Sequence, residues 1–296
     1  YINNDIKNGK KYAIKAEEIK KELQRSLWNE DLNFFTVLPK KYDETTNPLD
    51  VRELIGYVPW YFNLPDDKPK YAIAWNKIMD TTSFLAPVGL TVTEQSDPYF
   101  KVSYEGHECQ WNGPSWPFAT TQTLKALANF LSNYSNNKTV SKDDYYNLLL
   151  QYSRQHKIEK DNGEIINWID ENLNPYTGDW ISRTRLKDWE GKGWSDDKGG
   201  EERGKDYNHS GFTDLILSDL LGIKPQLDNT IEIKPLIPDN WEWFAVDNIP
   251  YQGEKLSLVW DRNGKKYGRG KGLMLFKENT LVAKSNKVEN LTYSMK

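Results

Sequence analysis

Residues 120–131 read Thr-Thr-Gln-Thr-Leu-Lys-Ala-Leu-Ala-Asn-Phe-Leu, and this stretch decides the fold class. Its residues Leu124, Leu127, Ala128 and Leu131 follow the i, i+3, i+4, i+7 spacing that places side chains on one face of a helix. Similar helical spacing recurs in residues 12–23, 51–58, 71–78, 145–152 and 213–221. The sequence therefore predicts six one-sided helices, which pair into three helical hairpins.

The helix over residues 145–152 has a start signal in the sequence before it, and the apolar residues change from helical to strand spacing after residue 225. Ser141 is followed by two aspartates, a pattern typical of a helix N-cap. After Pro225, apolar and polar residues alternate, which is the period of a β-strand. The alternating segments are residues 231–234, 256–260 and 272–276. Asn263-Gly264 is the strongest hairpin signal. We predict a mainly α helical-hairpin domain over residues 1–224 and a small antiparallel β-sandwich over residues 225–296.

Charge and apolar content exclude several classes of partner. The chain has 296 residues, with 39 basic and 43 acidic side chains and a formal net charge of −4, so we expect neither nucleic acid nor a membrane as a partner. No apolar run approaches the roughly 20 residues of a spanning helix. The single cysteine, Cys109, excludes an intrachain disulfide and a multi-cysteine zinc site. The compartment stays open, with a periplasmic or secreted full-length protein as the expectation.

Aromatic residues are abundant, with 12 Trp and 17 Tyr, and some lie in a long connection over residues 89–114. Connections of this length in a compact domain are usually functional. Trp111 and Trp116 offer ring faces, and Gln110 and Asn112 offer amide donors and acceptors, which together suit a sugar. The alternative that both tryptophans fill the core between helices stays open.

A second long connection, over residues 163–208, holds the adjacent carboxylates Asp170 and Glu171. Adjacent side chains on an extended segment point to opposite faces, so acid–base chemistry would use one of them while the other faces away. An exposed, structural pair is the alternative.

The end of that connection carries Tyr207 and His209 before the last helix. His209 is a candidate ligand-binding residue or a structural histidine. Together with His107 and Cys109 it lacks the short paired spacing of a zinc site, and no nucleotide-phosphate motif or serine-nucleophile motif is present. We expect no metal and no cofactor.

Several of these motifs resemble one family of enzymes. Gln110-Trp-Asn-Gly-Pro-Ser-Trp-Pro resembles the Gln-Trp-Asp-x-Pro-x-Gly-Trp-type signature of the inverting (α/α)6 glycoside hydrolases. These include trehalases, processing α-glucosidases and mannosylglycerate-hydrolase-like enzymes, in glycoside hydrolase families 37 and 63 and relatives. Glu171-Asn-Leu-Asn-Pro-Tyr-Thr-Gly is similar to the element that holds the general base of these families. Leu27-Trp-Asn-Glu-Asp-Leu-Asn-Phe-Phe and Tyr207-Asn-His-Ser-Gly-Phe extend the resemblance over most of residues 12–223.

The resemblance implies a toroid of six helical hairpins, of which this chain would supply three. It implies Glu171 as the general base, a general acid upstream of Tyr1, and substrate contacts from Gln110, Trp111, Asn112, Trp116, Tyr207 and His209. Asn112 stands where the family has aspartate, which leaves one sugar-hydroxyl contact open. We therefore expect the C-terminal part of a larger enzyme, whose partner is the missing N-terminal half of the toroid.

The resemblance therefore implies an inverting glycosidase that acts on the ends of α-linked oligosaccharides or glycosides, without a cofactor. Two alternatives stay open. A non-catalytic carbohydrate-binding or scaffold module would tolerate replacement of Glu171 without consequence. A polysaccharide lyase of toroid shape would instead require a Tyr or His base near a group that neutralises a uronic acid.

Overall fold

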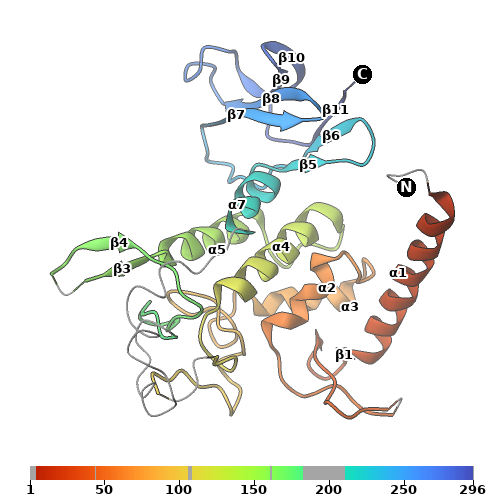
Figure 1. Ribbon diagram of the computed structural model, residues 1–296, viewed down its shortest axis with the longest axis vertical. Coiled ribbons are helices and arrows are strands. Elements are labelled where there is room, and N and C mark those ends of the chain that lie inside the picture. The colour runs from red at the N-terminus through yellow and green to blue at the C-terminus, as the bar shows by residue number, and fades with distance from the viewer. Residues whose placement is uncertain (1–4, 44, 106–108, 161, 183–210, 296) are drawn as a thin grey trace. The chain divides into compact units, whose positions relative to one another are not determined.

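Figure 1 shows the computed structural model of the chain, which describes residues 5–43, 45–105, 109–160, 162–182 and 211–295. The chain divides into two compact units, residues 1–212 and residues 213–296. The second unit begins before residue 224, where the change of period places the boundary, and that boundary stays a prediction. Each unit is described by itself below.

The first unit opens with the predicted helix. α1 (Ile6–Ser26) is capped by Asp5, whose carboxylate accepts a hydrogen bond of 3.0 Å from the Asn8 amide. The helix extends beyond the predicted residues 12–23 at both ends. No residue of α1 is buried. Its apolar stripe therefore remains accessible, and it lines a cavity that is described with the site.

A pair of longer helices follows later in the unit. α4 (Pro117–Asn133) and α5 (Lys142–Gln155) confirm the two predicted helices with the most regular apolar spacing. Ser141 caps α5 as predicted, because its hydroxyl accepts from the Asp144 amide and the Asp144 carboxylate accepts from the Ser141 amide. α5 buries one face, as its pattern requires, whereas α4 is also buried on all sides over residues 126–130.

Two other predicted helices are short and partly replaced. Residues 51–53 are not helical, and the 3-10 helix η1 (Leu54–Tyr57) and α2 (Val58–Tyr61) follow them. The reason is pairing with a distant segment, since the Leu54 amide donates to the Val92 carbonyl at 2.8 Å and the Glu94 amide donates to the Arg52 carbonyl at 3.1 Å. A helix would need those same groups for its own hydrogen bonds. The segment predicted as helix 71–78 consists of α3 (Pro69–Ala72) and the 3-10 helix η2 (Ile73–Lys77).

The core of the first unit is largely aromatic. The Trp75 ring stacks on Tyr57 and on Phe130, with centroid distances of 4.3 and 5.2 Å. Further buried rings are Trp28, Phe34, Phe35, Trp60, Tyr71 and Phe84, three of them on the short hairpin of β1 (Trp28–Asn29) and β2 (Phe34–Phe35). The aromatic content of the sequence therefore serves packing first, and composition alone does not argue for sugar binding.

Antiparallel strands occur in both units. In the first, β3 (Lys157–Glu159) pairs with β4 (Ile165–Asn167) immediately before the Glu171 segment. α7 (Gly211–Asp214) and the π-helical turn η4 (Leu215–Leu220) occupy the sixth predicted helix. The described residues thus combine helices with antiparallel sheets, and the mainly helical toroid stays a prediction.

The second unit contains two antiparallel sheets, and the predicted C-terminal β domain is confirmed. One sheet has the strand order β10-β9-β8-β7 and the other β11-β6-β5. The strands are β5 (Ile223–Pro225), β6 (Thr230–Ile233), β7 (Trp243–Tyr251), β8 (Glu254–Asp261), β9 (Gly272–Lys277), β10 (Thr280–Ser285) and β11 (Leu291–Ser294).

The tight turn of this unit is not the predicted one. Gln252 and Gly253, both with positive φ, join β7 to β8 as a two-residue hairpin turn requires. Asn263 and Gly264 lie instead in a longer connection between β8 and β9. The Asp261 carboxylate shapes that connection by accepting three backbone hydrogen bonds from residues 264–267.

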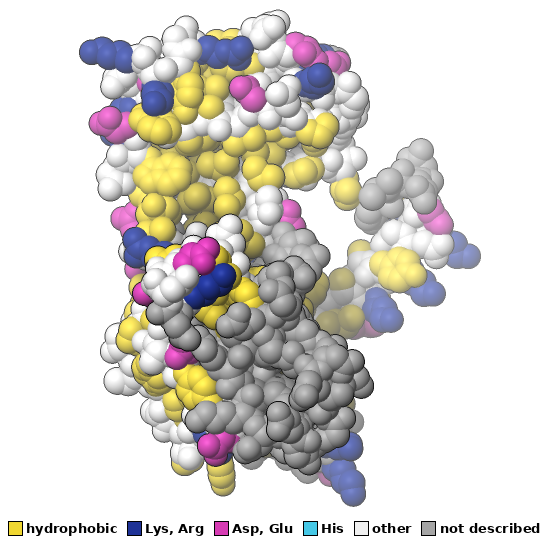
Figure 2. All heavy atoms as spheres, turned by 60° about the vertical axis from the view of Figure 1, so that its left-hand side comes forward, with side chains coloured by type: hydrophobic (Ala, Val, Ile, Leu, Met, Phe, Trp, Pro, Cys, Tyr) yellow, Lys and Arg dark blue, Asp and Glu magenta, His cyan; other side chains and the backbone are white. Residues whose placement is uncertain are grey.

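Charged side chains are mixed over the surface. On the face drawn in Figure 2, Lys and Arg side chains are scattered among Asp and Glu side chains. Within the described part of the chain, no helix is both long and apolar enough to cross a bilayer.

Candidate active site

Glu171 lies on an irregular segment just after the β3–β4 hairpin. Trp168, Leu173 and Trp180 form a buried cluster that anchors this segment. Asp170 and Glu171 are both buried, with 0% and 7% of their surfaces exposed. The alternative that they form an exposed, structural pair is therefore wrong. The Asp170 carboxylate accepts a hydrogen bond of 2.6 Å from the Glu171 backbone amide. Asp170 therefore positions the Glu171 backbone and is not an independent group that merely faces away.

Ser182 and Cys109 contact the Glu171 carboxylate. The Ser182 hydroxyl donates to Oε2 at 3.3 Å, and the Cys109 thiol lies 3.9 Å from the same oxygen. Ser182 is fully buried, whereas Cys109 is exposed. The carboxylate therefore lies between the interior and the surface, beside the end of the first long connection.

Backbone pairing joins the two connections that carry the sequence motifs. Ser115 and Leu173 exchange two hydrogen bonds of 2.9 Å, and Leu173 also bridges to Trp180. Ser115 directly precedes Trp116, and Leu173 lies two residues after Glu171. The predicted sugar platform and the predicted base are therefore on neighbouring backbone segments.

The two tryptophans of the motif have different environments. Their rings stack with centroids 3.9 Å apart and planes 18° apart. Trp116 is 3% exposed and its Nε1 donates to the Gln110 carbonyl at 2.7 Å, so it fills the core. Trp111 is 44% exposed. Trp116 supports Trp111, which presents a rigid ring at the surface.

The two motif amides bind their own loop. The Gln110 side chain donates to the Ser103 carbonyl at 2.7 Å and accepts from the Ser103 amide at 3.0 Å. The Asn112 side chain donates to the Tyr99 carbonyl at 2.9 Å, and its backbone carbonyl accepts from the Lys101 amide at 2.9 Å. Both residues therefore stabilise the loop that carries the exposed tryptophan.

Gly113 marks a close approach in the same loop. A Cβ atom at this position would lie 2.1 Å from the Lys101 carbonyl oxygen. Tyr207 and His209, and also His107, lie outside the described residues, so the roles predicted for them stay predictions. No three His, Cys, Asp or Glu side chains gather into a metal-binding group within the described ranges.

A family model for the mannosylglycerate hydrolase MGH1-like glycoside hydrolase domain matches residues 2–210. The chain belongs to this family. A second model, for the C-terminal domain of glycosyl hydrolase family 65, matches residues 225–275. The resemblance to mannosylglycerate-hydrolase-like glycosidases is thereby confirmed, and so is the prediction that the chain is of a glycoside hydrolase class.

Solved structures similar to this MGH1-like chain include one named sialidase, with 38% sequence identity and a TM-score of 0.81. The match covers 96% of this chain and 24% of that one, so this chain spans about a quarter of the length of that relative. A family 63 mannosylglycerate hydrolase from Thermus thermophilus, in complex with Tris and D-glycerate, is 15% identical over 53% of this chain and 32% of that chain, with a TM-score of 0.37. That similarity is too low to carry an argument.

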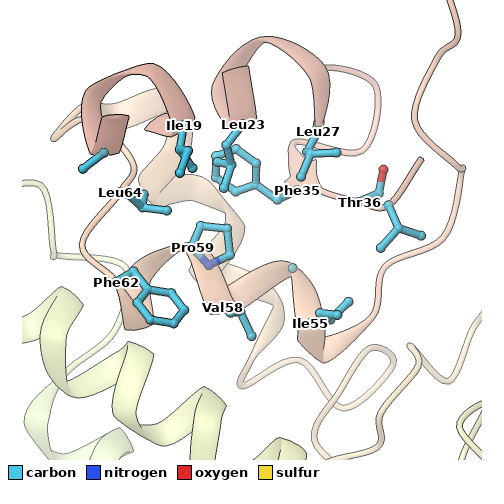
Figure 3. Close-up of a pocket in the computed structure, with 13 residues that line it drawn as sticks. Ile19, Leu23, Leu27, Phe35, Thr36, Ile55, Val58, Pro59, Phe62 and Leu64 are labelled. Atoms are coloured by element: carbon cyan, nitrogen blue, oxygen red, sulfur yellow. The ribbon is translucent and has the colours of Figure 1, made fainter. Parts of the chain in front are cut away.

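The MGH1-like domain also has an apolar cavity of about 510 Å³, which is a poor candidate for a sugar site. Figure 3 shows Ile19, Leu23 and Leu27 of the α1 region on one side of it and Val58 and Pro59 of α2 on the other. The walls are almost entirely hydrocarbon, so they offer few partners for hydroxyl groups. Sugar recognition needs polar groups that converge on the ligand.

Sequence reasoning missed three side chains of the MGH1-like domain. Ser182 and Cys109 contact the Glu171 carboxylate but lie 11 and 62 residues from it in the sequence. Glu53 lines a cavity with Trp111, although the helical spacing of its neighbours suggests a solvent-exposed helix position. Neither Ser182 nor Glu53 carries a sequence signal that predicts these positions.

Proposed function

We propose that the protein carrying this chain is an inverting glycoside hydrolase that acts on the ends of α-linked sugars, with Glu171 as the general base. One observation carries the proposal: Glu171 is 7% exposed, and its carboxylate touches both the buried Ser182 hydroxyl and the thiol of the exposed Cys109. A carboxylate held at the edge of the interior is oriented and still within reach of a water molecule.

In this mechanism Glu171 takes a proton from water while the water oxygen attacks the anomeric carbon. The bond to the leaving oxygen breaks as a carboxylic acid protonates that oxygen; in inverting enzymes this acid lies about 6.5–9.5 Å from the carboxylate of the base. No described residue is assigned as this acid. The proposal includes an (α/α)6 toroid, to which the first unit contributes part of the ring.

The Ser182 hydroxyl and the Asp170 carboxylate have supporting roles in this scheme. Ser182 orients the Glu171 carboxylate through Oε2, and Asp170 fixes the Glu171 backbone through its amide. The exposed face of Trp111 supports the sugar ring, since an indole face matches the C–H face of a pyranose.

Glu171→Gln in the active protein tests the base. We expect hydrolysis of aryl α-glycosides to fall by at least about a hundredfold, because general-base catalysis contributes about 10² to 10⁴ in rate. Circular dichroism and thermal unfolding should change little, since glutamine retains the shape of the side chain. Glu164→Gln is the matched control, because Glu164 is exposed and its carboxylate pairs with Lys160, at 3.4 Å, across the β3–β4 turn.

Two further measurements separate a base from a structural residue. Azide should restore activity to Glu171→Ala, because this anion attacks carbon without needing a base. The first product of the wild-type protein should have the β configuration by NMR. Equal activity in Glu171→Gln and wild type, or a product that retains the α configuration, would contradict the proposal.

A further inference from the structure

A small cavity lies beside Trp111. It has a volume of about 240 Å³, and its lining includes Glu53, Ile55, Phe118 and Gln122 besides Trp111. Ile55, Trp111 and Phe118 keep 56%, 44% and 51% of their surfaces exposed, so these walls are open to solvent. Apolar and aromatic walls with a few polar side chains are typical of a small-molecule site.

Backbone hydrogen bonds hold Glu53 in register with Trp111. Glu53 and Thr93 form an antiparallel bridge, and the Thr93 hydroxyl donates to the Trp111 carbonyl at 3.2 Å. The Val92 amide donates to the Pro114 carbonyl at 3.4 Å. Three segments that are distant in the sequence therefore fix the two sides of the cavity relative to each other.

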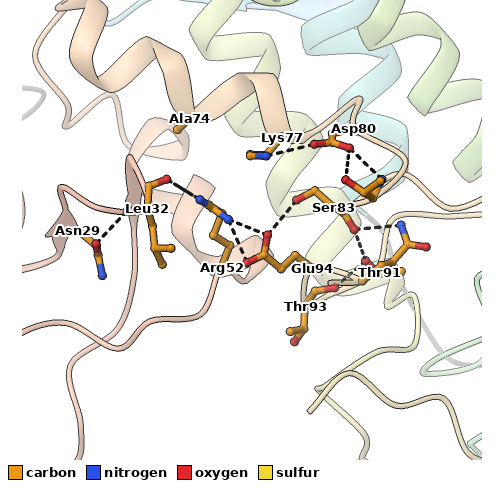
Figure 4. Close-up of polar contacts among 12 residues, drawn as sticks. Asn29, Leu32, Arg52, Ala74, Lys77, Asp80, Ser83, Thr91, Thr93 and Glu94 are labelled. Carbon is orange, nitrogen blue, oxygen red and sulfur yellow. Dashed lines mark hydrogen bonds and ion pairs between the residues drawn. The ribbon is translucent and has the colours of Figure 1, made fainter. Parts of the chain in front are cut away.

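Arg52 does not neutralise Glu53, although the two residues are adjacent. The Glu53 backbone is extended, with φ −129° and ψ 153°, so neighbouring side chains point to opposite faces. The Arg52 guanidinium binds Glu94 at 2.8 and 3.1 Å and donates twice to the Leu32 carbonyl, as Figure 4 shows. Neither Arg52 nor its partners Glu94 and Leu32 line the cavity.

The Glu53 carboxylate itself has no hydrogen bond or ion pair with any residue that the structure describes, and the same holds for the Gln122 amide. Burial, and then the negative charge of Asp97, raises the pKa of the Glu53 carboxyl above its ordinary value of 4.5. A partly buried carboxylate without a partner destabilises a fold. A ligand explains its presence better than stability does.

We propose that Glu53 is a substrate-binding residue, whose carboxylate accepts hydrogen bonds from adjacent hydroxyl groups of a sugar ring that packs against Trp111. The proposal rests on the proposed glycosidase function. A carboxylate only accepts hydrogen bonds, adjacent hydroxyls supply two donors, and Gln122 can serve a third hydroxyl. The cavity is smaller than the roughly 300–1,000 Å³ of sites for drug-sized ligands, so it fits one ring rather than an oligosaccharide.

Calorimetric binding of D-glucose, D-mannose and D-galactose tests this role. The sugar that binds the wild-type protein best should bind Glu53→Gln about tenfold to a hundredfold more weakly, since hydrogen bonds to a charged group are lost. Glu164→Gln should bind like wild type. If the wild-type protein binds none of the three sugars, or if Glu53→Gln binds as tightly as wild type, the proposal is overturned.

Thermal unfolding separates a binding role from a structural one. The pKa of Glu53 is higher in the folded state than in the unfolded state. The stability of the wild-type protein therefore falls as the pH rises from the ordinary pKa of 4.5 through the raised pKa, and Glu53→Gln lacks this loss. We expect the variant to melt at or above the wild-type temperature at pH 7. If Glu53→Gln unfolds instead, the binding test is repeated with Glu53→Asp, which keeps the carboxylate on a side chain that is shorter by one methylene.

Kinetics distinguish this proposal from the glycosidase function on which it rests. With p-nitrophenyl and 2,4-dinitrophenyl α-glycosides, Glu53→Gln should raise KM by at least tenfold for both leaving groups. A loss of kcat confined to the poorer leaving group would identify a general acid and overturn the binding role. A wild-type protein that hydrolyses neither compound, yet binds sugar through Glu53, would refute only the glycosidase function.

Discussion

Arg52→Ala would remove the ion pair next to the extended residue Glu53. In the structure Arg52 donates two hydrogen bonds to the Glu94 carboxylate, at 2.8 and 3.1 Å, and two to the Leu32 carbonyl, at 2.9 and 3.2 Å. The side chains of Arg52 and Glu94 are only 16% and 10% exposed. Among the described residues, the substitution would leave Glu94 with a hydrogen bond of 3.4 Å from Ser83.

The expected magnitude follows from this burial. Removing one partner of a buried pair destabilises a protein by about 3–5 kcal/mol, whereas an exposed pair contributes about 0–1 kcal/mol. Because both side chains retain some contact with water, we expect the lower end, about 3 kcal/mol. For a unit of this size, that corresponds to a fall in Tm of about 6–12 °C.

Urea unfolding followed by tryptophan fluorescence measures the change. Lys70→Ala is the control, because Lys70 pairs with Glu30 at 2.6 Å while 47% and 69% of the two side chains are exposed. The control should lose less than about 1 kcal/mol. Arg52→Met combined with Glu94→Leu should recover much of the loss, because no charge is then left buried. If Arg52→Ala lowers the free energy of unfolding by less than about 1 kcal/mol, the Arg52–Glu94 pair behaves as an exposed pair and the reasoning is refuted.

Three further outcomes are expected. Iodoacetamide should abolish the proposed glycosidase activity by alkylating Cys109, which is exposed and whose thiol lies 3.9 Å from the Glu171 carboxylate, while Cys109→Ser should stay active and resist the reagent. An active alkylated protein would refute the contact. Trp116→Ala should lower the unfolding free energy by about 3–5 kcal/mol because the ring is buried, whereas Trp111→Ala should mainly weaken sugar binding, and equal losses of stability would contradict this division. Hydrogen bonds from the Ser135 hydroxyl and neighbouring groups hold the pKa of Asp67 well below its ordinary 3.8, so the stabilising effect of its carboxylate is present above about pH 4 and is lost in stronger acid. The melting temperature of Asp67→Asn should therefore fall less in acid than that of the wild type.

The parts of the fold that the sequence predicts are those fixed by local spacing. α4 and α5 form where four apolar residues repeat along one face, and the Ser141 capping box depends only on residues three positions apart. Residues 51–58 have equally good helical spacing, yet their first residues pair with residues 92–94. A pattern within one segment carries no information about a distant strand that competes for its hydrogen bonds.

The candidate site divides in the same way. Glu171 and Trp111 stand out in the sequence because their residue types and neighbours suggest chemistry. The contacts of Cys109 and Ser182 with Glu171, and the place of Glu53 beside Trp111, arise only when the chain folds. The amides of Gln110 and Asn112 also show that a residue suited to sugar binding can hydrogen-bond within its own loop.

The isolated bridges at Leu173 have a consequence for heat inactivation. Among the described residues, isolated bridges and not a continuous ladder hold Leu173 to Ser115 and to Trp180, so the segment that carries Glu171 depends on the buried cluster of Trp168, Leu173 and Trp180 more than on a ladder of backbone hydrogen bonds. Regions with few such bonds open locally at a lower free energy than the whole fold. On warming, activity should therefore decline before circular dichroism changes, and the Leu173 and Ser115 amides should exchange with deuterium earlier than those in the middle of α4.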